Sequence, residues 1–150
     1  MPKSIIINKH GGPEVLELVD AAVRSPGPKH IKIKNLAIGL NFIDTYHRSG
    51  LYPLKLPSGI GMEGAGIIQE VGSDVKNFSK GDNVTYASPP IGSYSEERVI
   101  PENIAIKIPD GISIFVISAI RCPISVKSSV SSAICKRLIE PNVLPKIGIS

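Results

Sequence analysis

The sequence predicts a mainly β domain that folds as a small barrel with short helices. Many short stretches rich in isoleucine, valine and leucine are separated by glycine and proline turns. Hardly any segment has the period of a helix, and regularly spaced short strands of this kind are typical of barrels. A glycine-rich run over residues 57–73 interrupts one of these strands.

This glycine-rich run is expected to form a sharply curved, bulged strand. Its β-favouring residues are Ile67, Ile68 and Val71. Glycines adopt positive φ or let a second backbone approach closely, which a strand that turns a barrel corner requires. The glycines concerned are Gly59, Gly61, Gly64, Gly66 and Gly72. Such a strand also leaves room for a ligand beside it.

Composition indicates one domain and excludes several classes of function. The 150 residues are 42% hydrophobic and 20% charged, which suits a single core. The net charge of +4 comes from scattered lysines without a recognition motif, so no nucleic-acid partner is expected. Cys122 and Cys135 lack metal or redox spacing and are interpreted as reduced thiols, which predicts a cytoplasmic protein.

No membrane segment is expected either. The start of the chain has no secretory apolar region. The longest apolar stretch, Ile112 to Ile120, contains two serines and is well short of the roughly 20 residues that span a bilayer.

The first two strands are predicted at Ser4–Asn8 and Val15–Asp20, joined as a hairpin through a Gly-Gly-Pro turn. His10 lies at this turn, where a solvated or capping histidine is favoured over a metal ligand. Alternation then predicts a long strand over residues 31–40 whose phase slips near Asn35, which indicates a bulge. Two separate strands remain an alternative.

A short helix follows over residues 41–50. Asn41 is a suitable N-cap and Gly50 a suitable end. Asp44 lies in the first turn, where the helix dipole favours a carboxylate, and Phe42 and Ile43 are expected to point inward. Further strands are predicted at Asn83–Ala87, Ser93–Ile100 and Ile104–Ile108.

Several motifs together carry a family resemblance. They are Lys9–Leu16, Asn41–Tyr46, Arg48–Pro53, Gly61–Gly66 with Gly72 and Val75, and Gly92–Ser95. Over Ser4–Ser113 the chain resembles the quinone oxidoreductase (zeta-crystallin-like) branch of the medium-chain dehydrogenase/reductase superfamily. The resemblance implies a GroES-like, partly open β-barrel, which is the catalytic domain of these NADPH-dependent, zinc-independent oxidoreductases.

The same comparison argues against a metal. In zinc alcohol dehydrogenases a cysteine ligand stands where this chain has Asn41, and a histidine ligand where it has Met62. An amide and a thioether do not replace these ligands on a catalytic zinc. We therefore expect no zinc and no other metal site.

The resemblance also implies a site. It places Asn41, Phe42, Ile43, Asp44, Thr45 and Tyr46 along the nicotinamide side of a cleft, with Tyr52 beside them. Asn41, Tyr46 and Tyr52 are the expected catalytic groups, as hydrogen-bond donors or stacking walls, and Asp44 is expected to orient them. Structural roles remain open: Asn41 as a helix cap, the tyrosines as core aromatics, Asp44 as a dipole partner and Glu63 as a support of the glycine-rich strand.

The predicted division is a catalytic domain over residues 1–113 and a divergent tail over residues 114–150, with a frameshift as one hypothesis for the tail. No glycine-rich turn opens a helix after a strand, so no Rossmann domain is expected in this chain. The function expected is that of a truncated NADPH:quinone oxidoreductase acting on a small quinone or enone. The alternative is a non-enzymatic GroES-like remnant or binding module. NADPH binding by this chain alone is an open question, and self-association through uncovered apolar surface is expected.

Overall fold

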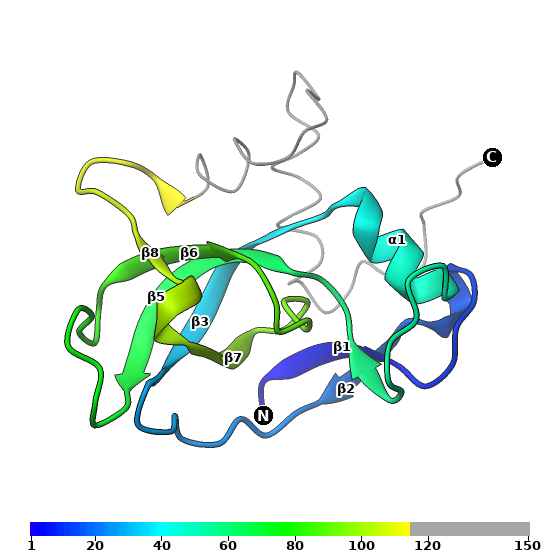
Figure 1. Ribbon diagram of the computed structural model, residues 1–150, viewed down its shortest axis with the longest axis horizontal. Helices are drawn as coiled ribbons and strands as arrows, with labels where there is room; N and C mark the ends of the chain where they lie inside the picture. Colours follow the sequence, from blue (N-terminus) through cyan, green and yellow to red (C-terminus); the bar gives the residue numbers. More distant parts are fainter. Residues whose placement is uncertain (115–150) are drawn as a thin grey trace.

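The computed structural model describes residues 1–114, which form two antiparallel β-sheets and one α-helix (Figure 1). The smaller sheet has the order β2-β1-β4, with β2 at Glu17–Asp20, β1 at Lys3–Ile7 and β4 at Ser58–Gly59. The larger has the order β7-β3-β5-β6-β8, with β7 at Glu97–Pro101, β3 at His30–Gly39, β5 at Glu63–Val71, β6 at Asn83–Ala87 and β8 at Ile106–Lys107. The helix is α1 at Phe42–Ser49, and 3₁₀ turns occupy Pro13–Val15 and Glu102–Ile104.

The predicted β architecture is confirmed, and so is the hairpin. β1 and β2 pair antiparallel, with Ile5 opposite Leu18. Three strands are shorter than predicted, because Val15 and Ile104 belong to 3₁₀ turns and residues 93–96 precede β7. The described residues contain no Rossmann fold and no helix with the length and apolar character needed to cross a bilayer.

β3 is one strand with the predicted irregularity at Asn35. The pairing with β5 shifts between Asn35 and Ala37, and again between Lys32 and Ile33. The Asn35 side chain is buried and its amide nitrogen donates to the carbonyl oxygens of Ser93 (3.3 Å) and Ser95 (2.8 Å). The bulge therefore turns a polar side chain toward the segment that leads into β7.

The glycine-rich run forms two strands instead of one. β4 ends at Gly59, the backbone turns at Gly61 with φ of 89°, and β5 begins at Glu63. Only glycine adopts this conformation without strain. Further along, a methyl group at Gly66 would overlap the Lys34 carbonyl across the β3 bulge, so the close backbone approach predicted for this run is present.

Residues 93–96 join the two sheets and partly close the barrel. The Ile5 amide donates to the Tyr94 carbonyl at 2.7 Å, and the Glu96 amide donates to the Lys3 carbonyl at 2.9 Å. Ser4 also forms a β-bridge with Ser95. The smaller sheet is thus attached to the larger one by backbone hydrogen bonds, in agreement with the predicted partly open barrel.

Two main groups of buried side chains support this arrangement. The group within the larger sheet consists of Ile31, Ile33, Ile68, Val84, Tyr86 and Ile100. The group near the smaller sheet consists of Ile7, Val15, Ile60 and Tyr94. The second group matters for the site, because Tyr94 extends from it to α1.

The predicted tail, apart from Ile114, lies outside the described residues, as do both cysteines. The division at residue 113 and the frameshift hypothesis therefore stay predictions.

Candidate active site

The helix α1 begins and ends where the sequence predicts. Asn41 is the N-cap, and its backbone N–H donates to the Asp44 carboxylate (2.9 Å). Gly50 ends the helix in the left-handed conformation, with φ of 87°. His47 and Arg48 lie in the last turn, where the helix dipole favours positive charge.

The orientation of α1 differs from the prediction. Its buried side chains are Asp44 and His47, whereas Phe42 is 63% exposed and Tyr46 39% exposed. Ile43 is half-buried, so the expectation that Phe42 points inward is wrong. The reason is that the hydrogen-bonding partner of Asp44 lies in the core below the helix, which turns the aromatic side of α1 outward.

Asp44 and Tyr94 form the contact between α1 and that core. The Tyr94 hydroxyl donates to Asp44 Oδ2 at 2.9 Å. Burial raises the pKa of the Asp44 carboxyl, although the Asn41 N–H, the Tyr94 hydroxyl and His47 each act to lower it. Burial, together with the nearby Asp44 carboxylate, also raises the pKa of Tyr94. Both effects disfavour additional negative charge beneath α1.

At the other side of the helix start, Asn41 contacts Glu63. Asn41 Nδ2 donates to Glu63 Oε2 at 2.9 Å. Glu63 is the first residue of β5, opposite Gly39 in β3, and it is 4% exposed. The half-buried Asn41 therefore acts as more than a helix cap, because its side chain connects α1 to the glycine-rich strand.

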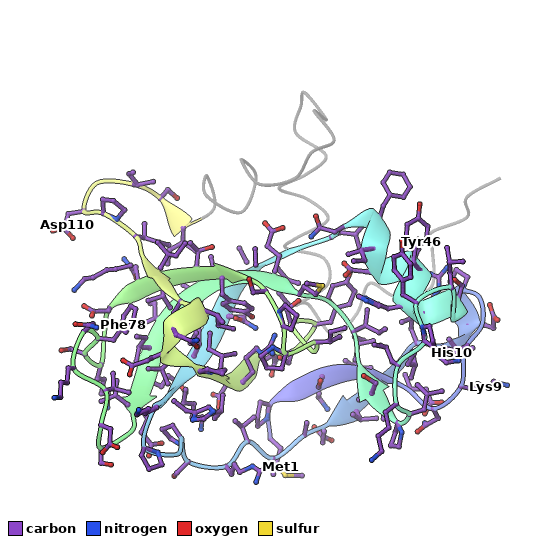
Figure 2. The ribbon with its side chains drawn as sticks, viewed as in Figure 1. Met1, Lys9, His10, Tyr46, Phe78 and Asp110 are labelled. Atoms are coloured by element: carbon purple, nitrogen blue, oxygen red, sulfur yellow. The ribbon has the colours of Figure 1, made fainter. Side chains whose placement is uncertain are left out.

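Tyr46 and Tyr52 lie together at the end of α1. Their rings meet edge to face with centroids 5.6 Å apart, and the Tyr52 amide donates to the Tyr46 carbonyl at 3.2 Å. The Tyr52 ring is also 6.3 Å from that of the buried His47. Figure 2 shows Tyr46 projecting from α1. Both tyrosines are exposed, at 39% and 51%, which argues against their being core aromatics.

The structure thus brings Tyr46 and Tyr52 into contact and pairs Asn41 with Glu63. Thr45 is half-buried and its hydroxyl donates to the Phe42 carbonyl at 2.7 Å. The sequence reasoning missed Tyr94 and His47. His47 follows Asp44 by three residues and so shares its helix face, a signal that was present in the sequence.

His10 also has a more specific place than predicted. It is half-buried against Gly50, and its Nε2 accepts from the Leu54 amide at 3.5 Å (Figure 2). Gly11 and Arg48 exchange two hydrogen bonds nearby: the Gly11 amide donates to the Arg48 carbonyl at 3.0 Å, and Arg48 Nε donates to the Gly11 carbonyl at 3.3 Å. The turn after β1 therefore supports the C-terminal end of α1.

Within residues 1–114 no three histidine, cysteine or carboxylate side chains lie close enough to one another to hold a metal ion. At the positions singled out for zinc, Asn41 offers an amide that is bonded to Glu63, and Met62 offers a thioether. These residues do not fit a catalytic zinc site.

Comparison with known proteins defines the class of this domain. Residues 27–110 match the family model of the alcohol dehydrogenase GroES-like domain. The chain belongs to this family.

Within that family the chain is similar to quinone oxidoreductases. It is 54% identical to the quinone oxidoreductase of Pseudomonas aeruginosa over 113 residues, which are 75% of this chain and 35% of that protein. It is 49% identical to quinone oxidoreductase 1 of Escherichia coli over 114 residues, with the same shares. The chain spans about a third of the length of these curated relatives.

Solved structures agree with this placement. The quinone oxidoreductase of Pseudomonas syringae superposes with a TM-score of 0.77 at 51% identity, over 79% of this chain and 37% of that one. The Escherichia coli quinone oxidoreductase complexed with NADPH has a TM-score of 0.73 at 49% identity, over 75% of this chain and 35% of that one. The resemblance read from the sequence is confirmed: the chain corresponds to the N-terminal GroES-like domain of the quinone oxidoreductase branch.

Proposed function

We propose that this chain forms the catalytic half of an NADPH:quinone oxidoreductase, in which hydride passes from NADPH to a quinone without zinc. The observation that carries the proposal is the outward side of α1. There Phe42, Tyr46 and Tyr52 are exposed, and the half-buried Asn41 amide stands at the start of the same helix. This arrangement occurs in a chain whose relatives are quinone oxidoreductases.

NADPH is the proposed cofactor because a similar protein was solved in complex with it. The residues fit the nicotinamide end of such a molecule, since flat aromatic faces beside an amide suit a planar ring that carries a carboxamide. Asn41, Phe42, Ile43, Asp44, Thr45 and Tyr46 are the residues proposed to line that ring. NADPH would supply the hydride, and these residues would hold the ring and keep water away.

The donors near α1 suit a quinone as the acceptor. A quinone that accepts hydride becomes an aromatic anion, with negative charge on an oxygen. Hydrogen-bond donors aimed at that oxygen stabilise the charge as it develops. We assign this role to the Asn41 amide and to the Tyr46 and Tyr52 hydroxyls.

The two side chains at the expected ligand positions support a reaction without zinc. Asn41 and Met62 occupy the positions at which zinc alcohol dehydrogenases have ligands, and neither side chain is a suitable zinc ligand. Addition of zinc should therefore leave the rate of NADPH oxidation unchanged.

The test is NADPH oxidation by the purified chain with a small quinone. Tyr52→Phe and Asn41→Ala should each lower kcat by roughly 10- to 100-fold, because each removes a donor to the developing anion. Leu18→Ala, an exposed change on β2, is the control and should keep the wild-type rate.

Equal rates for the wild type and both site variants would contradict the proposal. No turnover, together with no change in NADPH fluorescence on titration with the chain, would favour the alternative of a non-enzymatic binding module.

A further inference from the structure

We propose that Glu63 is a positioning residue, whose buried carboxylate holds the Asn41 side-chain amide in one orientation at the start of α1. The inference rests on the proposed function, in which Asn41 is a donor to substrate. It assigns to a residue of the glycine-rich strand a role that is distinct from supporting that strand.

The fold makes a specific space for this carboxylate. Glu63 is paired with Gly39 across β5 and β3, and both residues are buried. A methyl group at Gly39 would overlap the Glu63 carboxyl group. Gly39 is not one of the glycines with positive φ. The need for space, and not the backbone conformation, therefore explains why a glycine stands here. Glu63 is therefore confined to the direction that leads to Asn41.

The side-chain carboxylate of Glu63 has Asn41 as its hydrogen-bond partner. Oε2 accepts from Asn41 Nδ2 at 2.9 Å, while Oε1 is buried and has no hydrogen-bond partner among the described residues. A buried acceptor with a single donor holds that donor firmly, because a hydrogen bond in a medium of low dielectric is stronger than one in water. The Asn41 amide should thus be held more firmly than a solvated asparagine.

Holding one N–H of Asn41 leaves the second N–H available. An asparagine amide has two N–H groups and one carbonyl oxygen. With one N–H bonded to Glu63 and the side chain also engaged with the Asp44 backbone in the capping box of α1, the second N–H keeps a fixed direction for a ligand. A fixed donor acts on a developing charge without first reorienting.

The role needs an acceptor oxygen, not a proton. Glutamine has the same shape and an acceptor oxygen, so Glu63→Gln should preserve the position of Asn41. Glu63→Asp keeps the charge but withdraws the carboxylate by one methylene group. Gly39→Ala keeps Glu63 and displaces it. An acid-base role would instead be lost in Glu63→Gln.

The decisive experiment is nuclear magnetic resonance of the ¹⁵N-labelled full chain. The Asn41 side-chain signals are assigned by their loss in Asn41→Ala. In the wild type and in Glu63→Gln, one Asn41 proton should exchange slowly and be shifted from solvated values. In Glu63→Asp and in Gly39→Ala, the two Asn41 side-chain proton signals should move toward the values of a solvated amide, while backbone signals of β2 and β7 stay in place.

Kinetics then test the consequence for catalysis. Glu63→Asp should lower kcat about tenfold with little change in KM, because misplacement of a reacting group lowers the rate more than it weakens binding. Glu63→Gln should stay within about threefold of the wild type. Wild-type Asn41 signals in both Glu63→Asp and Gly39→Ala would overturn the inference, as would wild-type turnover in Glu63→Asp. A wild-type chain without turnover would count against the proposed function alone, and the Asn41 spectrum would still decide the position of the amide.

Discussion

Asp44 places a carboxylate in the first turn of α1, where the helix dipole favours it, yet the structure buries that carboxylate. Oδ2 accepts from both the Asn41 backbone N–H and the Tyr94 hydroxyl, whereas Oδ1 has no hydrogen-bond partner among the described residues. Burial outweighs these donors and raises the pKa of Asp44. The residue that anchors α1 is therefore also sensitive to pH.

The stability of the domain should depend on pH through Asp44. The folded-state pKa of Asp44 is raised, so protonation of its carboxyl stabilises the folded state. This stabilisation is fully present below the unfolded-state pKa of about 3.9 and is lost as the pH rises through the folded-state pKa. Asp44→Asn keeps an acceptor oxygen and removes the ionisation. Urea unfolding over a pH series should show the wild type losing stability relative to Asp44→Asn as the pH rises.

Tyr94→Phe provides a second arm of that experiment. It removes a donor that lowers the pKa of Asp44, so the loss of stability with rising pH should be larger than in the wild type. Parallel pH profiles for the wild type and Asp44→Asn would contradict this account of Asp44.

Gly61 combines a left-handed backbone with a crowded neighbourhood. Its φ is 89°, and a methyl group there would overlap the Ser93 hydroxyl and the Tyr94 ring. Gly81→Ala is a matched control, because Gly81 also has positive φ (96°) but open space around it. Gly81→Ala should lower the free energy of unfolding by about 1–2 kcal/mol, which is the backbone cost alone.

Gly61→Ala adds a steric cost of about 1–3 kcal/mol and should lower the free energy of unfolding by roughly 2–5 kcal/mol in total. Chemical denaturation of both variants measures the difference. Equal losses in the two variants would show that the space beside Gly61 is unimportant.

At the scale of elements, the orientation of α1 decides which side chains face outward. Asp44 and His47 turn toward the core, and Phe42 and Tyr46 turn away from it. The amphipathic pattern of the helix is therefore opposite to the usual one, in which apolar residues face the core. The structure therefore leaves an aromatic surface exposed beside buried polar groups, and the proposed function depends on this surface.

The bulge in β3 also contains a buried polar residue that connects two elements. Asn35 donates to two carbonyl oxygens of the segment before β7, and its Oδ1 accepts from the Tyr86 hydroxyl at 3.0 Å. Asn35→Ala removes these bonds and leaves the buried Tyr86 hydroxyl without its acceptor, so the free energy of unfolding should fall by about 2–4 kcal/mol. Urea denaturation is the measurement.

Tyr86→Phe is the control for Asn35. It removes one hydrogen bond and should cost about 1 kcal/mol. A loss for Asn35→Ala no larger than that for Tyr86→Phe would mean that the bonds to Ser93 and Ser95 contribute little.

At the scale of the whole molecule, five of the nine exposed large apolar side chains of the described residues gather in one part of the chain. Leu40, Phe42, Tyr46, Leu51 and Tyr52 are all exposed, and they all belong to α1 or its flanking residues. We call these five residues the α1 surface. Clustered apolar exposure of this kind favours association with another surface.

Self-association is therefore expected to depend on the α1 surface. The double variant Phe42→Ser with Leu51→Ser removes two residues that are each 63% exposed and should shift the chain toward monomer. Leu18→Ser, on the edge strand β2, should leave the association as in the wild type. Light scattering over micromolar concentrations measures the effect, and a wild-type chain that stays monomeric throughout would refute the prediction.

The local signals in the sequence were sufficient for most of the strands, although not for all of their ends, and for the hairpin, the irregularity at Asn35 and both ends of α1. Each depends on residues close together in the chain, such as alternation, a Gly-Gly-Pro turn, an N-cap or a terminal glycine. The motifs at residues 9–16, 41–53, 61–75 and 92–95 were together also sufficient for the family. The break of the glycine-rich run at Gly61 was missed, because a glycine permits positive φ without requiring it.

Only the tertiary structure decided which face of α1 is buried and which partners the site residues have. Asn41 meets a carboxylate 22 positions away, and Asp44 meets a hydroxyl 50 positions away. We predicted that Phe42 points inward because an apolar residue usually favours the core. A buried hydrogen bond to Asp44 outweighed that preference, and its partner becomes adjacent only when residues 93–96 join the two sheets.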